Sequence, residues 1–267
     1  MQQLKKQQTL SIINLLSVLF AIGINYYSQL YTINGNRVSD MSEKYSNLFT
    51  PAGYAFAIWG VIFIAIFIFA LYQIDRTLVR KRTFDFITQT GGWFALANVA
   101  NGLWIVAWLY DYTLLSVVVM LVILFSLLKI VINTNMERWQ APAKTIMFGW
   151  WPISIYAGWI SVATIANIAS YLSKIGWDGG FLSPVAWTIS LIVVVTLLNI
   201  VLIFTRGMRE FAVVGAWALV AIYVRHRFDY ESIAITAIVG AVIILISTFA
   251  HAYRNRRINP FYGNYFR

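Results

Sequence analysis

The sequence has no cysteine and few charged residues. The first absence excludes cysteine chemistry, and the second argues against a soluble protein. Without cysteine, the chain of 267 residues has no disulfide bond, thiolate metal site or cysteine nucleophile. Only 11% of the residues are charged and 60% are hydrophobic, and the mean hydropathy is +0.71. A soluble domain of this length could not bury so much apolar surface. The composition therefore predicts an integral membrane protein whose surroundings are a lipid bilayer.

Long uncharged runs predict the membrane helices. A hydrocarbon core of about 30 Å takes roughly 20 helical residues to cross. Runs near that length fall at 10–31, 52–73, 93–110, 113–132, 147–171, 183–204, 209–224 and 232–252. They do not alternate apolar and polar residues, as the strands of an outer-membrane barrel would. We expect an all-α, polytopic membrane helix bundle of about eight transmembrane helices, of which the seventh is the shortest in uncharged sequence.

Charge is also missing from the interior of these runs, which narrows the possible functions. A proton-coupled transporter or pump would need an intramembrane carboxylate. No lysine follows Lys174, so a retinal Schiff base on a late helix is excluded. The two histidines, His226 and His251, are not placed to form the paired axial ligands of a membrane cytochrome. Because no acid, base or metal-ligating set is evident, we assign no catalytic residue and no metal site, and an enzyme is the less supported class.

The basic residues are distributed unevenly between the two sides of the predicted bundle. With the N-terminus in the cytoplasm, 15 of the 20 lysines and arginines lie on the cytoplasmic side. The other side keeps Arg37, Lys44, Lys174, Arg225 and Arg227. The positive-inside rule then places both termini in the cytoplasm, and we expect a bacterial inner membrane. A basic face next to anionic lipid explains the formal charge of +10, so no nucleic-acid partner is expected.

Two predicted helices carry aromatic and amide side chains on one face. In the run 93–110, Asn101, Trp104 and Trp108 recur at helical spacing. In the run 147–171, the stripe is Tyr156, Trp159, Ala163 and Asn167. Such faces could enclose a flat apolar ligand, with the indoles stacking on it and the amides meeting its few polar atoms. Tryptophan also gathers at membrane interfaces and asparagine also bonds neighbouring helices, so periodicity alone leaves packing and a pocket as alternatives.

The same residues resemble the motifs of a known family. The spacing Tyr156-x-x-Trp159-x-x-x-Ala163-x-x-x-Asn167 resembles the fifth-helix pattern of the TspO/MBR family, the tryptophan-rich sensory proteins that include the translocator protein. Asn101-x-x-Trp104 is similar to the third-helix signature of that family. The segment FTPAGYAFAIWGVIF (49–63), which contains Trp59, is similar to its second-helix entry. The resemblance covers residues 10–171.

The resemblance implies a five-helix bundle, residues 1–171, that binds tetrapyrroles or other flat hydrophobic molecules and requires no cofactor. Its pocket would open toward the loop 32–51, which is rich in Asn, Ser and Gly and is expected to act as a lid. Residues 172–267 would form an appended unit of three helices, divided from the bundle by the glycine-rich loop 173–184. The residues expected to line the pocket are Trp59, Asn101, Trp104, Trp108, Tyr156, Trp159, Ala163 and Asn167.

Two functional classes follow from these sequence features. The first is a sensory or transport-related protein that binds a porphyrin-like ligand in an aromatic-lined pocket inside the membrane. The alternative is a non-catalytic helical subunit of a larger membrane complex for pigment binding or transport, because the last helices have few polar groups of their own and could form an interface in lipid. The expected partners are the lipid bilayer, a hydrophobic small molecule, and either a second copy of the chain or other membrane subunits.

Overall fold

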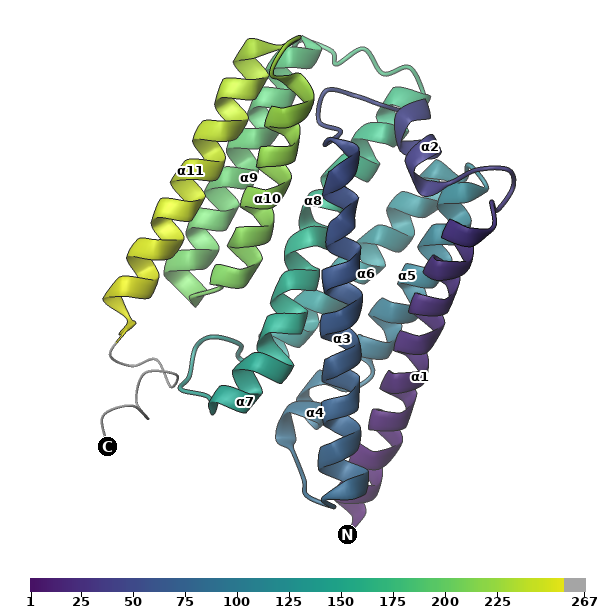
Figure 1. The fold of residues 1–267 in the computed structure, drawn as a ribbon, viewed down its shortest axis with the longest axis vertical. Helices are drawn as coiled ribbons and strands as arrows, with labels where there is room; N and C mark the ends of the chain where they lie inside the picture. Colours follow the sequence, from purple (N-terminus) through teal and green to yellow (C-terminus); the bar gives the residue numbers. More distant parts are fainter. Residues whose placement is uncertain (257–267) are drawn as a thin grey trace.

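The computed structural model describes residues 1–256, and this part of the chain folds as an all-α bundle, as predicted (Figure 1). The helices are α1 (Gln2–Leu30), α2 (Val38–Lys44), α3 (Ile58–Ile74), α4 (Asp85–Thr90), α5 (Trp93–Leu109), α6 (Thr113–Asn133), α7 (Ala143–Thr145), α8 (Trp151–Lys174), α9 (Pro184–Arg206), α10 (Arg209–His226) and α11 (Glu231–Arg254). A turn of 3-10 helix, Gly53–Ala57, leads into α3, and π-helical turns follow α3 at Asp75–Val79 and precede α8 at Ile146–Trp150.

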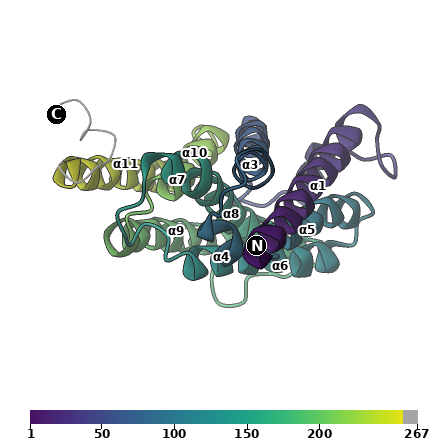
Figure 2. The same ribbon diagram turned by 90° about the horizontal axis from the view of Figure 1, so that it is seen from below.

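The long helices run between two ends of the molecule. The short helix α2 lies at one end, hereafter the α2 end, while α4, α7 and the N-terminus lie at the opposite end (Figure 1). Figure 2 shows α9, α10 and α11 on one side of α8 and α1, α5 and α6 on the other. Within this arrangement α10 packs against α8, α9 and α11, so α8 and α10 form the contact between the two sides.

Six helical segments, rather than eight, are long and apolar enough to cross a membrane. They are Gln2–Leu30, Gly53–Val79, Thr113–Asn133, Ala143–Lys174, Pro184–Arg206 and Glu231–Arg254. The predicted third span corresponds to α5, whose 17 residues extend only about 26 Å. The predicted seventh span corresponds to α10, which carries Arg209 and Glu210 in its first turn and Arg225 in its last. The expectation of eight spans is therefore corrected to six by length and composition, with α5 and α10 packed beside them.

A stripe of polar side chains fixes α1 in the bundle. Its buried polar residues Gln7, Ser11, Asn14 and Ser17 recur every three or four positions and so share one helical face, and Ser28 lies three turns further on. Hydrogen bonds between side chains join α1 to its neighbours, among them Gln7 to Thr88 (2.8 Å), Thr77 to Ser11 (3.1 Å), Asn14 to Gln73 (2.8 Å), Asn98 to Ser17 (3.3 Å) and Asn25 to Asn101 (2.8 Å), each named donor first. In a bilayer, such bonds between helices contribute roughly 0.6–2 kcal/mol each.

Glycines bring α8, α9, α10 and α11 into close contact. A Cβ atom built on Gly158 of α8 would lie 2.8 Å from the backbone oxygen of Phe211 in α10. Gly215 of α10 meets Asn199 of α9 in the same way, and Gly240 of α11 meets Thr196 of α9, each with a built Cβ at 2.6 Å. Small residues at crossings are typical of membrane helices, because close packing replaces the hydrophobic effect as a source of attraction.

We predict that Gly158→Ala destabilises the bundle. The added methyl group would meet backbone atoms of α10 that cannot move without shifting the helix, and overpacking of this kind costs about 1–3 kcal/mol. Thermal unfolding in detergent would show a lowered midpoint. Gly23→Ala in α1 is the matched control, since a Cβ there meets nothing within 4 Å. Equal midpoints for the two variants would contradict a tight α8–α10 contact.

Candidate functional site

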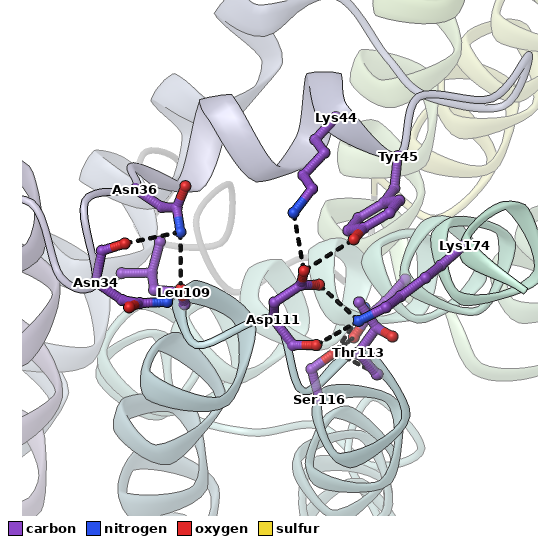
Figure 3. Close-up of polar contacts among 10 residues, drawn as sticks. Asn34, Asn36, Lys44, Tyr45, Leu109, Asp111, Thr113, Ser116 and Lys174 are labelled. Atoms are coloured by element: carbon purple, nitrogen blue, oxygen red, sulfur yellow. Dashed lines mark hydrogen bonds and ion pairs between the residues drawn. The ribbon is translucent and has the colours of Figure 1, made fainter.

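The segment between α1 and α3 covers the α2 end, where hydrogen bonds to Asp111 fix its position. This aspartate follows α5, and its carboxylate accepts hydrogen bonds from Lys44 Nζ and Tyr45 OH, both at 2.9 Å (Figure 3). On its other side Lys174 Nζ, at the end of α8, donates to the carboxylate at 2.7 Å and to the backbone oxygen of Asp111 at 2.6 Å. One carboxylate therefore joins the loop of 32–51 to the α5–α6 turn and to α8.

The electrostatics of this contact favour the ionised carboxylate. Partial burial opposes ionisation of Asp111, but the hydrogen bonds from Lys174, Lys44 and Tyr45 outweigh it and lower its pKa to about 2 from 3.8. Because the folded-state pKa is depressed, the stabilisation is fully present above about pH 4 and is lost as the pH falls toward 2. At neutral pH the contact is intact.

A second set of contacts ties the same segment to α10. The two guanidinium nitrogens of Arg225 donate to the two carboxylate oxygens of Glu43, at 2.9 and 3.0 Å. These hydrogen bonds from Arg225 lower the pKa of Glu43 despite partial burial. The ring Nε2 of His226 lies 2.9 Å from the backbone oxygen of Leu48. The lid is thus anchored on both sides of the bundle.

A small cavity of about 50 Å³ lies beneath this lid. Six of the eight predicted site residues line it: Trp59, Trp104, Trp108, Trp159, Ala163 and Asn167. The lid contributes Val38 and Ser42, and the segment before α3 contributes Phe56. The prediction omitted these residues, although Phe56 lies one helical turn before Trp59 in the segment 49–63. This volume has room for only a few water molecules, so the site is closed in this structure.

The amide of Asn167 is bonded across three helices. Its Oδ1 accepts from the indole Nε1 of Trp104 in α5 at 3.0 Å, and its Nδ2 donates to the hydroxyl of Ser116 in α6 at 3.0 Å. Trp104 in turn stacks on Trp108, with ring centroids 5.9 Å apart and planes 14° apart. Asn167 therefore orients one wall of the cavity, and both of its polar atoms already have partners.

Trp159 presents a free donor instead. The side chain is 2% exposed, and its indole Nε1 has no hydrogen-bond partner among residues 1–256. Its ring makes edge contacts with Phe56 and Trp59, at centroid distances of 6.0 and 6.4 Å. A buried N–H without a partner costs free energy, so an acceptor atom in the cavity would stabilise this arrangement.

Two predicted residues do not line the cavity. The Asn101 Oδ1 accepts a hydrogen bond from Asn25 of α1, and the Tyr156 hydroxyl donates to the backbone oxygen of Ala97 at 3.5 Å. Tyr156 still meets the edge of Trp59, at a centroid distance of 6.1 Å. Both side chains pack behind the wall of the site rather than in it.

A larger cavity of about 500 Å³ adjoins the small one and lies between α1, α3 and α5. The two share Val38, Phe56, Trp59 and Trp104 as lining. On its outer side the larger cavity is lined by Tyr26, which is 64% exposed. No charged side chain lines either cavity within the described part of the chain. The chemistry available here is ring stacking, apolar contact and a few neutral hydrogen bonds.

We expect Asp111→Asn to release the lid. The neutral amide loses both lysine ion pairs, so trypsin should cut more rapidly after Arg37 and Lys44, which lie in the loop. Cleavage of the folded protein in detergent, followed by mass spectrometry, measures the rate. Asp178→Asn is the matched control, because that carboxylate is exposed and accepts only from the backbone of Gly180 within residues 1–256. Cleavage at the same rate in both variants would contradict the role given to Asp111.

Known protein families provide the context for this site. The family described as TSPO-like protein matches residues 11–250, so the match continues past residue 171 and includes most of α11. No curated protein and no solved structure matched the chain. The match covers nearly the whole sequence, and the motifs that carried the resemblance supply six residues of the cavity lining, with Asn101 and Tyr156 behind them. The chain belongs to the TSPO-like protein family.

Proposed function

We propose that this protein binds a flat hydrophobic ligand of the tetrapyrrole class between α1, α3, α5 and α8, in a sensory or transport-related role. The observation that carries the proposal is the pair of adjoining cavities, about 50 and 500 Å³, walled by indole rings and free of charged side chains among the described residues. Small-molecule sites commonly measure about 300–1,000 Å³ and are mostly apolar with few polar groups.

The wall between the cavities is made of side chains rather than backbone. Val38 belongs to the lid, while Phe56 and Trp59 lie on the 3-10 turn and the first turn of α3. Movement of the lid together with rotation of these rings would join the two spaces. A planar ligand could then lie against Trp59 and Trp104, with an acceptor atom near the Trp159 N–H.

The arrangement of the helices supports a binding unit at residues 1–171 with residues 172–267 as a separate unit. Helices α9 to α11 lie together on one side of α8 rather than between the first five long helices (Figure 2). The loop between the units ends where Pro184 begins α9, with the Ser183 hydroxyl accepting from the Ala186 backbone N–H at 3.2 Å. The end of the second unit, 257–267, lies outside the described residues.

We predict that Trp159→Phe weakens ligand binding while leaving the fold intact. The smaller ring keeps the packing but loses the N–H and part of the stacking area. An aromatic contact of this kind is worth on the order of 1 kcal/mol, or about fivefold in affinity. Titration with protoporphyrin, followed by quenching of tryptophan fluorescence, measures the affinity, and detergent melting measures stability.

Two further variants separate binding from packing. Trp177→Phe, in the exposed loop after α8, should change neither affinity nor melting. Asn167→Leu should mainly lower the melting temperature, because it breaks the bonds to Trp104 and Ser116. An affinity of Trp159→Phe equal to that of the unmodified protein would refute the ligand contact.

We further propose that the α2 end faces outward and both termini face the cytoplasm of a bacterial inner membrane. Three of the basic residues at the α2 end share two carboxylates, since Lys44 and Lys174 both pair with Asp111 and Arg225 pairs with Glu43. Most of the lysines and arginines lie at the opposite end, as the positive-inside rule requires of a cytoplasmic face. Arg257 and Arg267, counted on that side from the sequence, lie outside the described residues.

Labelling of single cysteines tests this orientation. Ser39→Cys in α2 and Asp178→Cys in the loop after α8 should react with a membrane-impermeant maleimide added to intact cells. Lys81→Cys at the opposite end should react only after the cells are opened. The native chain has no cysteine, so it is the blank. Labelling of position 81 from outside would reverse the orientation.

A further inference from the structure

A second large cavity, of about 530 Å³, lies at the end opposite α2, away from the aromatic site. It is bounded by the loop after α6, the start of α8, the α9–α10 turn and the end of α11. Sequence patterns assign this region no role, because its charged residues lie at or beyond the ends of the long apolar runs.

Charged side chains surround this cavity without forming ion pairs with one another among the described residues. Its lining includes Arg138, Arg206 and Arg209 together with Glu137 and Glu210. Within residues 1–256 the ion pairs lie elsewhere, and none joins any two of these five residues. This contrasts with the α2 end, where Asp111 and Glu43 are both paired. Unpaired charge in a recess at the end of a bundle is unfavourable unless something else balances it.

Several hydrogen-bond donors in the lining also have no partner in the described chain. They are Arg206 Nη1 at the end of α9, Arg209 Nε at the start of α10 and the indole Nε1 of Trp150 before α8. Each of these atoms is buried, and Trp150 as a whole is 1% exposed. Buried polar atoms are normally bonded, and three unpartnered donors against one unpartnered acceptor, Glu210 Oε2, leave an excess of donors around this cavity.

His251 of α11 supplies a fourth donor. Its Nε2 lies 2.9 Å from the amide nitrogen of Asn255, which can only donate. In the neutral ring the proton is then on Nδ1, and this atom is buried and unpartnered among the described residues. The four donors come from four different elements, so they approach the cavity from several directions.

The net charge of the lining is positive at neutral pH. Burial, reinforced by the charge of Glu210 and opposed by Arg209, raises the pKa of Glu137 to about 8. Glu137 is therefore mostly neutral at pH 7, and three arginines face a single carboxylate of raised pKa, that of Glu210. A cation would be repelled from such a cavity.

We propose that this cavity is a binding site for a phosphate group. A phosphate presents several oxygens in a tetrahedral arrangement and can accept from donors on different sides at once, whereas a carboxylate offers two oxygens in one plane. Arginine is well suited to bind it through parallel N–H bonds. The phosphate could belong to a lipid headgroup at the membrane surface or to a soluble phosphate, and the chemistry of recognition is the same.

The test compares both sources on the purified full-length protein in a phosphate-free detergent. One arm adds inorganic phosphate against sodium chloride of equal ionic strength. The other adds phosphatidylglycerol against a diacylglycerol glycolipid that lacks phosphate. We expect at least one phosphate source to raise the melting temperature, and the arm that responds identifies the source.

Arg206→Gln and Arg209→Gln should each weaken the binding about tenfold, which corresponds to about 1.4 kcal/mol. Lys144→Gln is the control, because it removes one positive charge near the same end but does not line the cavity. If an arginine variant does not fold, Trp150→Phe removes a neutral donor and should weaken binding severalfold. No stabilisation by either source, or an equal response in all folded variants, would overturn the proposal.

Discussion

Helices in a bilayer gain little by exchanging lipid for protein, and this constraint governs how the bundle is built. Association therefore depends on polar side chains that bond across helices and on backbones that approach closely. The bond from Asn14 to Gln73 joins α1 to α3, and Asn167 joins α8 to α5 and α6. Gly158 lets α8 meet α10. These contacts fix the relative positions of the helices that line the aromatic pocket, and space remains between the rings.

The two ends of the molecule treat charge in opposite ways. At the α2 end, one aspartate forms ion pairs with two lysines and accepts a hydrogen bond from a tyrosine, and a glutamate pairs with an arginine. These ion pairs and hydrogen bonds fix the lid. At the opposite end, arginines and glutamates face a cavity without pairing within residues 1–256. The first arrangement closes a site to its surroundings, and the second leaves donors ready for an external acceptor. The same residue types thus form ion pairs that fix the lid at one end and line the proposed phosphate site at the other.

The sequence predicted the helices well because their apolar runs are long, as the agreement of 113–132 with Thr113–Asn133 illustrates. It overcounted the spans at α5 and α10, because α5 is only 17 residues long and α10 carries charged residues in both end turns. Six of the eight residues predicted as lining surround the small cavity, because Trp and Asn share helical faces at fixed spacing, and their contact with a ligand stays a prediction. Asn101 lies outside the cavity lining and bonds Asn25, a partner 76 positions away that only the packing of α1 brings near. The role of Asp111 could not be predicted from the sequence, since a single aspartate in a turn belongs to no periodic pattern or motif.

The larger cavity is lined by exposed Tyr26 and lies between α1 and α3, two helical segments long and apolar enough to cross a membrane, so a hydrophobic ligand of this protein would first partition into the bilayer. A hydrophobic molecule already dissolved among lipid tails gains almost nothing from entering another apolar space. Selectivity for a ligand in this pocket would therefore depend on its shape and on individual polar contacts, and not on the hydrophobic effect. Hydrophobicity alone would concentrate many compounds in the bilayer around the protein, and selectivity among them would depend on the geometry of the indole rings.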